Sequence, residues 1–251
     1  MYIDLEKAKQ QFFKYVKNYD ETLYKIDLKK WHSLRVMELS KNIATAINLN
    51  EEDIEIAAII GLLHDIARFE QYTRFKTFSD LDSFDHGDFG IEILNKDMRN
   101  YIETDKYDDL IKVAIRNHNK FKIEDGLSQR ELLFSKLIRD ADKIDIMFEA
   151  LTMFWINNES EINNSIVDDN ILNTFLSKKQ LKHEKGKKYT GFNDVINFLS
   201  LIFDINFKQS FKILKEKDYI NKILNRFSIK DKEAFEKVKK LANNYIEEHT
   251  T

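Results

Sequence analysis

The sequence predicts an all-α protein, and three observations carry this prediction. The 251-residue chain has no proline and only six glycines, so few residues interrupt a helix. Apolar and small residues recur every three or four positions, as in Ile54, Ala58 and Gly61. The strict alternation of apolar and polar residues that marks a half-buried strand is hard to find, despite abundant phenylalanine and isoleucine.

The elements follow from this spacing. Asn50 precedes three acids and is the expected N-cap of one helix. His32 is expected in the first turn of another, and a loop or broken helix is expected over the aromatic stretch 70–85. We expect helices over 4–18, 30–48, 51–65, 87–98, 106–119 and 128–156, with about four more within 161–250.

Length and composition limit the class of protein. The chain is expected to form one domain, 1–251, with a C-terminal helical extension over about 161–250. A net charge of -3 argues against a nucleic-acid partner, and the basic run 178–188, which includes His183, is expected to be a solvated loop. The lack of cysteine excludes disulfides and thiolate metal sites. With no signal peptide and no long apolar run, we expect a cytoplasmic protein that contacts no membrane. A homo-oligomer is compatible with the sequence.

Six histidine and aspartate residues form the strongest functional signal. Imidazole and carboxylate together suit borderline divalent metals. Taken singly, each residue is weak evidence for a metal site. A lone histidine is more often a core or boundary residue. Asp142 lies beside an apolar stripe and could be an exposed acid or an ion-pair partner of Arg139 or Lys143. Asp140 and Asp145 compete with Asp142 for the role. The candidates are His32, His64, Asp65, His86, His118 and Asp142.

The segments WHSLRV, GLLHDIAR and IRDADKID together resemble the HD-domain superfamily of metal-dependent phosphohydrolases. The middle segment RFEQYTRFKTFSDLDSFDHGDFGIEIL and the late segment LSLIFDINF are similar to small bacterial members. The metal motif occupies 32–142, while the resemblance extends over most of the chain. It implies an all-helical core of about five helices with additional C-terminal helices.

The resemblance also implies a ligand set. The family's metal ligands fall on His32, His64, Asp65 and Asp142. His86 and His118 match the additional histidines of members that bind a second metal, with Asp65 then bridging. The expected cofactor is one divalent ion, or two, drawn from manganese, iron, nickel, cobalt and magnesium.

The expected activity is hydrolysis of a small phosphate ester, such as a nucleotide, by attack of metal-activated water. Asp65 and Arg68 are the predicted catalytic residues. Arg68, four residues after His64, is expected to bind phosphate or to orient Asp65, and these roles are not separable from the sequence. Arg35 and Lys143 are weaker phosphate candidates.

Two alternatives stay open. One is a di-iron HD-domain oxygenase, which usually needs six ligands, and the other is a metal- or nucleotide-binding regulatory module without turnover.

The aromatic residues of the middle segment either line a ring pocket or lid, or belong to the core, which is the commoner case. They are Phe69, Tyr72, Phe75, Phe78 and Phe84.

Overall fold

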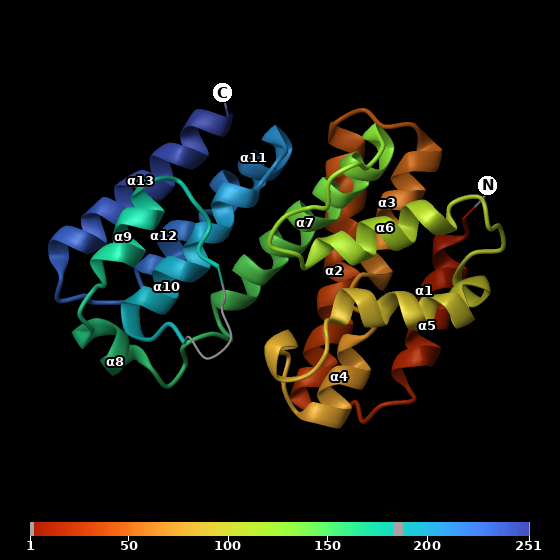
Figure 1. The fold of residues 1–251 in the computed structure, drawn as a ribbon, viewed down its shortest axis with the longest axis horizontal. Helices are drawn as coiled ribbons and strands as arrows, with labels where there is room; N and C mark the ends of the chain where they lie inside the picture. The colour runs from red at the N-terminus through yellow and green to blue at the C-terminus, as the bar shows by residue number, and fades with distance from the viewer. Residues whose placement is uncertain (1–2, 183–187, 251) are drawn as a thin grey trace. The chain divides into compact units, whose positions relative to one another are not determined.

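The computed structural model describes residues 3–182 and 188–250, and over these ranges it contains helices, turns and no strand (Figure 1). The all-α prediction is therefore confirmed. The described chain forms two compact units, residues 1–142 and 143–251. The expectation of a single domain over 1–251 stays a prediction. His183 and the following residues 184–187 of the basic run lie outside the described residues.

The first unit contains six complete helices and the first part of a seventh, which matches the expected helical core. Helices α2 and α3 pack along each other, α3 also contacts α1 and α6, and α5 packs against α1 and α6 (Figure 1). The bounds are α1 Leu5–Val16, α2 Tyr24–Ala46, α3 Glu51–Leu63, α4 Arg68–Phe75, α5 His86–Tyr101, α6 Asp108–His118 and α7 Gln129–Ala150.

The contact between α2 and α3 is close because α3 carries a glycine there. A Cβ built on Gly61 would lie 2.7 Å from Ser40 Oγ and 2.8 Å from both Met37 Cα and Val36 O. Two of these atoms belong to the backbone of α2, so even a methyl group forces the two helices apart. Gly61 therefore fixes the approach of the two helices that carry His32 and His64.

Local capping accounts for several helix starts. The Asn50 side chain accepts a hydrogen bond from Asp53 N, so the predicted N-cap of α3 is confirmed. Asp85 caps α5 by accepting from Asp88 N, which places His86 at the first helical position. The Asp85 cap thus sets where the candidate ligand His86 leaves its loop.

Two helix boundaries differ from prediction by six residues. Helix α2 begins at Tyr24, so His32 lies in its interior and not in a first turn. The helix extends because Ile26 is fully buried and no glycine or proline interrupts 24–30. Helix α7 ends at Ala150, six residues before the predicted end, and Trp155 beyond it has a positive φ of 60°.

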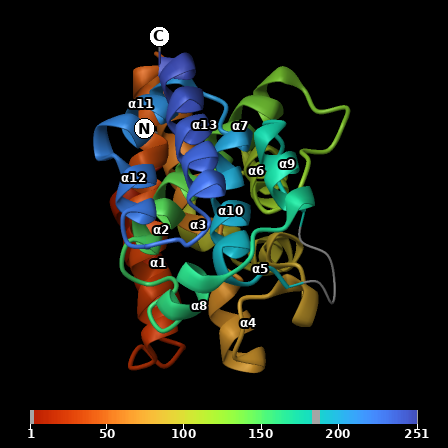
Figure 2. The same ribbon diagram turned by 90° about the vertical axis from the view of Figure 1, so that its left-hand side faces the viewer.

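The second unit is a group of shorter helices. Helix α13 packs against α9, α11 and α12, and α10 packs against α8 and α9 (Figure 2). Lys143 pairs with Asp204 at 2.7 Å within this unit, so Lys143 is part of an ordinary ion pair. The bounds are α8 Glu159–Asn164, α9 Asp169–Leu176, α10 Gly191–Leu199, α11 Lys208–Lys217, α12 Tyr219–Leu224 and α13 Lys232–Thr250.

Among the described residues, no helix is both long enough and apolar enough to cross a membrane.

Candidate metal centre

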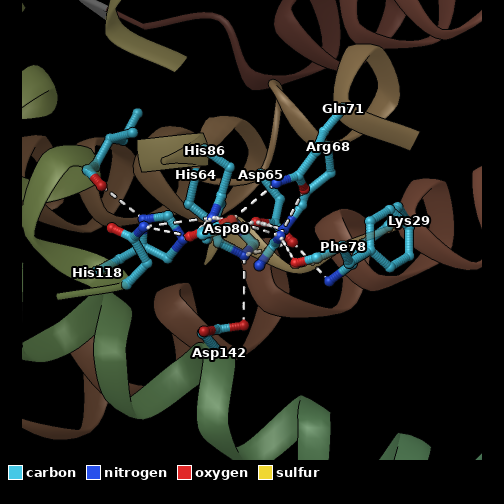
Figure 3. A network of polar contacts seen from close by, with 12 residues as sticks. Lys29, His64, Asp65, Arg68, Gln71, Phe78, Asp80, His86, His118 and Asp142 are labelled. Atoms are coloured by element: carbon cyan, nitrogen blue, oxygen red, sulfur yellow. Dashed lines mark hydrogen bonds and ion pairs between the residues drawn. The ribbon is translucent and has the colours of Figure 1, made fainter. Parts of the chain in front are cut away.

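The structure brings all six candidate ligands together in the first unit. His32 comes from the middle of α2, His64 and Asp65 follow α3, His86 begins α5, His118 ends α6, and Asp142 lies on α7. Figure 3 shows the side chains after α3 facing those of α5 and α6, with Asp142 approaching from α7. The five residues other than Asp142 are at most 3% exposed.

The end of α3 explains how two adjacent residues reach one site. Side chains of neighbouring helical residues point about 100° apart. Here α3 ends at Leu63, and the chain enters a turn in which Ile66 N donates to Leu63 O and Arg68 N donates to Asp65 O. The turn lets His64 and Asp65 point into the same cluster, as the position of the pair at a helix end predicted.

One group of ligand atoms surrounds one oxygen of Asp65. His32 Nε2 lies 3.2 Å from His64 Nε2 and 3.1 Å from Asp142 Oδ1. Asp65 Oδ2 lies 3.4 Å from His32 Nε2 and 3.6 Å from His64 Nε2. We call these four residues the first ligand group.

A second group faces the other oxygen of the same carboxylate. His86 Nε2 and His118 Nε2 are 2.9 Å apart, and they lie 3.3 Å and 3.6 Å from Asp65 Oδ1. We call Asp65, His86 and His118 the second ligand group. Asp65 thus presents a different oxygen to each group.

Hydrogen bonds at Nδ1, the ring nitrogen that faces away from the cluster, orient His64 and His118. His64 Nδ1 donates to Gly61 O at 2.8 Å and His118 Nδ1 donates to Ile115 O at 2.6 Å. Because a carbonyl oxygen only accepts, the proton of each neutral ring resides on Nδ1. The Nε2 lone pairs are then directed at the cluster, as metal coordination requires.

His86 is oriented by a carboxylate that sequence reasoning missed. Its Nδ1 lies 2.8 Å from Asp80 Oδ1 and 2.6 Å from Oδ2. Asp80 also accepts from Arg68 Nη1, Gln71 Nε2 and Asn119 Nδ2 at 2.9–3.1 Å. Burial opposes ionisation of Asp80, but these donors, His86 foremost, hold its pKa below the usual range. Asp80 therefore stays a carboxylate and fixes the ring of His86.

A buried lysine provides a cation beside the bridging carboxylate. Lys29 is 8% exposed, and its Nζ lies 2.7 Å from Asp65 Oδ2. Burial alone would raise the pKa of Asp65; Lys29 and the surrounding histidines outweigh it and hold that pKa well below its usual range. Asp142 is ionised for a similar reason, because His32 and His64 lower its pKa against the effect of burial.

The end of α6 is held by another buried cation. Arg139 is 1% exposed, and its Nη1 donates to Asn117 O at 2.8 Å, His118 O at 3.3 Å and Lys120 O at 2.5 Å. These carbonyls lie at a helix C-terminus, where intrahelical partners are missing. Arg139 thus caps α6 beside His118, and the Asp142 carboxylate contacts His32 and His64. Burial lowers the pKa of His118 to about 4, which favours the neutral ring that binds metal.

Arg68 is held largely by the neighbouring loop. Its Nη1 donates to Gln71 Oε1 and Phe78 O, both at 2.6 Å, and to Asp80 Oδ1 at 3.1 Å. Its Nε lies 3.4 Å from Asp65 Oδ1. Of the two roles that the sequence left open, these contacts favour the orientation of Asp65 over direct binding of phosphate.

The donor spacing tests whether the cluster fits divalent ions. Neighbouring ligands at about 2.1 Å from one ion are separated by about 3.0 Å at octahedral and about 3.4 Å at tetrahedral angles. The separations within both groups, 2.9 Å to 3.6 Å, match this range. Two donor sets within the first unit have ligand atoms that all lie within 4.8 Å of one another: His32 with His64 and Asp142, and His64 with Asp65 and His118. The residues therefore fit metal binding.

Comparison with protein families agrees with this geometry. Residues 31–147 match the family model described as HD domain, which is consistent with a protein of the HD-domain superfamily. The resemblance predicted from the three sequence segments is confirmed. Comparison with curated proteins and with solved structures found no similar protein. The family indicates a protein of the metal-dependent phosphohydrolase type, and no named relative specifies its substrate.

The aromatic residues of the middle segment divide between core and surface. Phe69 is fully buried and packs against Phe12, Tyr15 and Tyr19, with ring centroids 5.7–6.0 Å apart. Phe75 is 45% exposed, and the half-buried Phe78 lies beside Lys29 and Arg68. Only Phe78 among them is therefore placed beside the candidate metal centre by the contacts of the described residues.

Proposed function

We propose that the protein is a metal-dependent phosphohydrolase that acts on a small phosphate ester of the nucleotide type and binds two divalent ions. The observation that carries the proposal is the placement of Asp65, whose two oxygens face two separate groups of buried ligands. Divalent ions bound there would lower the pKa of water and polarise a phosphoryl oxygen.

The residues have distinct proposed roles. His32, His64 and Asp142 would hold one ion, His86 and His118 the other, and Asp65 would bridge them. Lys29 is the nearest cation to the bridging carboxylate, at 2.7 Å, and is placed to neutralise charge on a bound phosphoryl group. Arg68 and Asp80 are positioning residues, because they contact Asp65 and His86 and reach substrate only through them.

The proposal is tested by metal content and hydrolysis measured together. His64→Ala and Asp65→Ala are expected to lose bound metal and to abolish hydrolysis of a phosphoester panel in manganese buffer. His249→Ala is the control, since His249 is an exposed residue of α13 outside the ligand groups. Wild-type metal content in both ligand variants would refute the site. Metal binding without turnover of any ester would favour a regulatory module.

A second candidate is a di-iron oxygenase, which the convergence of all six ligands supports. The two activities differ in their need for oxygen. Hydrolysis is expected to continue anaerobically and to place oxygen from labelled water in the released phosphate. Consumption of dissolved oxygen by the iron-loaded protein, with no phosphate release, would favour the oxygenase.

A further inference from the structure

Three cations surround one aromatic ring next to the candidate metal centre. Lys29 Nζ and Arg68 Cζ each lie 5.5 Å from the centroid of Phe78, and Lys25 Nζ lies 5.9 Å from it. We call Lys25, Lys29, Arg68 and Phe78 the Phe78 cation cluster. The face of the ring attracts each cation electrostatically.

The Phe78 cation cluster leads outward from Asp65. Lys29 is buried and contacts Asp65 directly, and Figure 3 shows Lys29 and Phe78 together beside that carboxylate. Lys25 is one helical turn before Lys29 on α2, so the two lysines share a helix face. Lys25 and Phe78 are both half-buried, which leaves the outer end of the cluster accessible to a solute.

The charges of the cluster are unequally matched. Lys29 is paired with Asp65, and Arg68 is bonded to Asp80. Among the described residues, Lys25 forms no ion pair; its cation contacts are with the rings of Tyr24 and Phe78. Like charges gathered on one ring repel each other, and a bound anion would remove that cost.

We propose that Lys25 and Lys29 bind a second phosphate group of the substrate, so that the substrate carries two phosphates, as a diphosphate or a bisphosphate. This inference rests on the proposed phosphohydrolase function and specifies its substrate class. The phosphate nearer Asp65 would lie at the metal ligands, and the second would extend past Phe78 toward Lys25. A monophosphate ester has no group for Lys25 to contact.

The test compares pyrophosphate with orthophosphate as probes. Binding of each to the manganese-loaded protein is measured calorimetrically at constant free Mn²⁺, which requires no turnover. Lys25→Gln is expected to weaken pyrophosphate binding about two- to fivefold, the range of a partly exposed ion pair, and to leave orthophosphate binding unchanged. The charge reversal Lys25→Glu is expected to weaken pyrophosphate binding further. Lys41→Gln is the matched control, because Lys41 is an exposed lysine of the same helix.

The outcomes separate this inference from the function on which it rests. Equal effects of Lys25→Gln on both probes, or no effect on either, would overturn the second phosphate site. Preferential hydrolysis of monophosphate esters would also overturn it while leaving the hydrolase intact. Selective loss of pyrophosphate affinity, with unchanged metal content, would support the site even if the ester panel lacked the true substrate.

Discussion

Asp80 offers the sharpest test of how the loop between α4 and α5 controls the second ligand group. The perturbation is Asp80→Asn, which keeps the size of the side chain and removes its charge. Asp80 accepts hydrogen bonds from His86, Arg68, Gln71 and Asn119. An asparagine retains one acceptor oxygen, and its NH₂ group would face one of these donors.

The magnitude follows from the role of a carboxylate behind a metal-binding histidine. Loss of such a partner typically lowers metal affinity about 10- to 100-fold, which corresponds to about 1.4–2.7 kcal/mol. Only the second ligand group contains His86, so one of two binding steps is expected to weaken. The first group is held by other contacts, including the hydrogen bond from His64 Nδ1 to Gly61 O.

The assay is equilibrium dialysis against a series of free Mn²⁺ concentrations, followed by elemental analysis. Asp82→Asn is the control, because Asp82 is an exposed acid of the same short helical turn, Asp80–Asp82. It makes the same change in net charge without touching a ligand. Equal isotherms for the two variants, or loss of both binding steps in Asp80→Asn, would refute the reasoning.

Three further predictions concern nuclearity, packing and metal-linked stability. Wild-type protein is expected to hold two ions and His118→Ala one, by elemental analysis; a wild-type stoichiometry of one would return His86 and His118 to other roles. Gly61→Ala is expected to lower the free energy of unfolding by about 1–3 kcal/mol and to weaken metal binding, whereas Gly90→Ala, whose Cβ would meet nothing closer than 3.7 Å, is expected to be neutral or stabilising in thermal unfolding. Chelation is expected to lower the melting temperature, since ions at about 1,000 times Kd stabilise the folded state by about 4 kcal/mol; an unchanged melting temperature would contradict metal binding to the folded state.

The helices and the ligand set were predictable because both depend on short-range patterns. Spacing of three and four residues, the Asn50 cap and the position of His64-Asp65 after an apolar run all act within a few residues. The predicted start of α2 was wrong, because helix propensity alone does not show that Ile26 would be buried and prolong the helix. Tertiary packing decides such boundaries.

The residues that support the ligands were missed for a different reason. Lys29 lies three positions before His32, and this helix spacing could have suggested a shared face. Asp80 offers no comparable signal, because it lies in an irregular loop that folds back onto α4 through Gln71. Such contacts depend on loop conformation, which has no period to read in the sequence.

Arg68 is the residue for which the structure favours one of the two roles that the sequence left open. From the sequence, a phosphate contact predicts that Arg68→Ala weakens turnover and leaves metal content nearly unchanged. In the structure, Nη1 is bonded to Phe78 O and Asp80, and Nε faces Asp65. Arg68 thus ties both the bridging carboxylate and the carboxylate behind His86 to one side chain.

Removing Arg68 is therefore expected to weaken metal binding together with turnover, because Asp80 loses a charged donor and Asp65 loses the cation 3.4 Å away. Arg68→Lys is expected to recover only part of either property, since a single ammonium cannot reproduce the fork of the guanidinium. Arg74→Ala is the control: Arg74 is an exposed residue of the same helix, paired with Glu70. If dialysis showed wild-type metal affinity in Arg68→Ala while turnover fell, the phosphate contact predicted from sequence would be correct, and the loop contacts of Arg68 would be incidental to the metals.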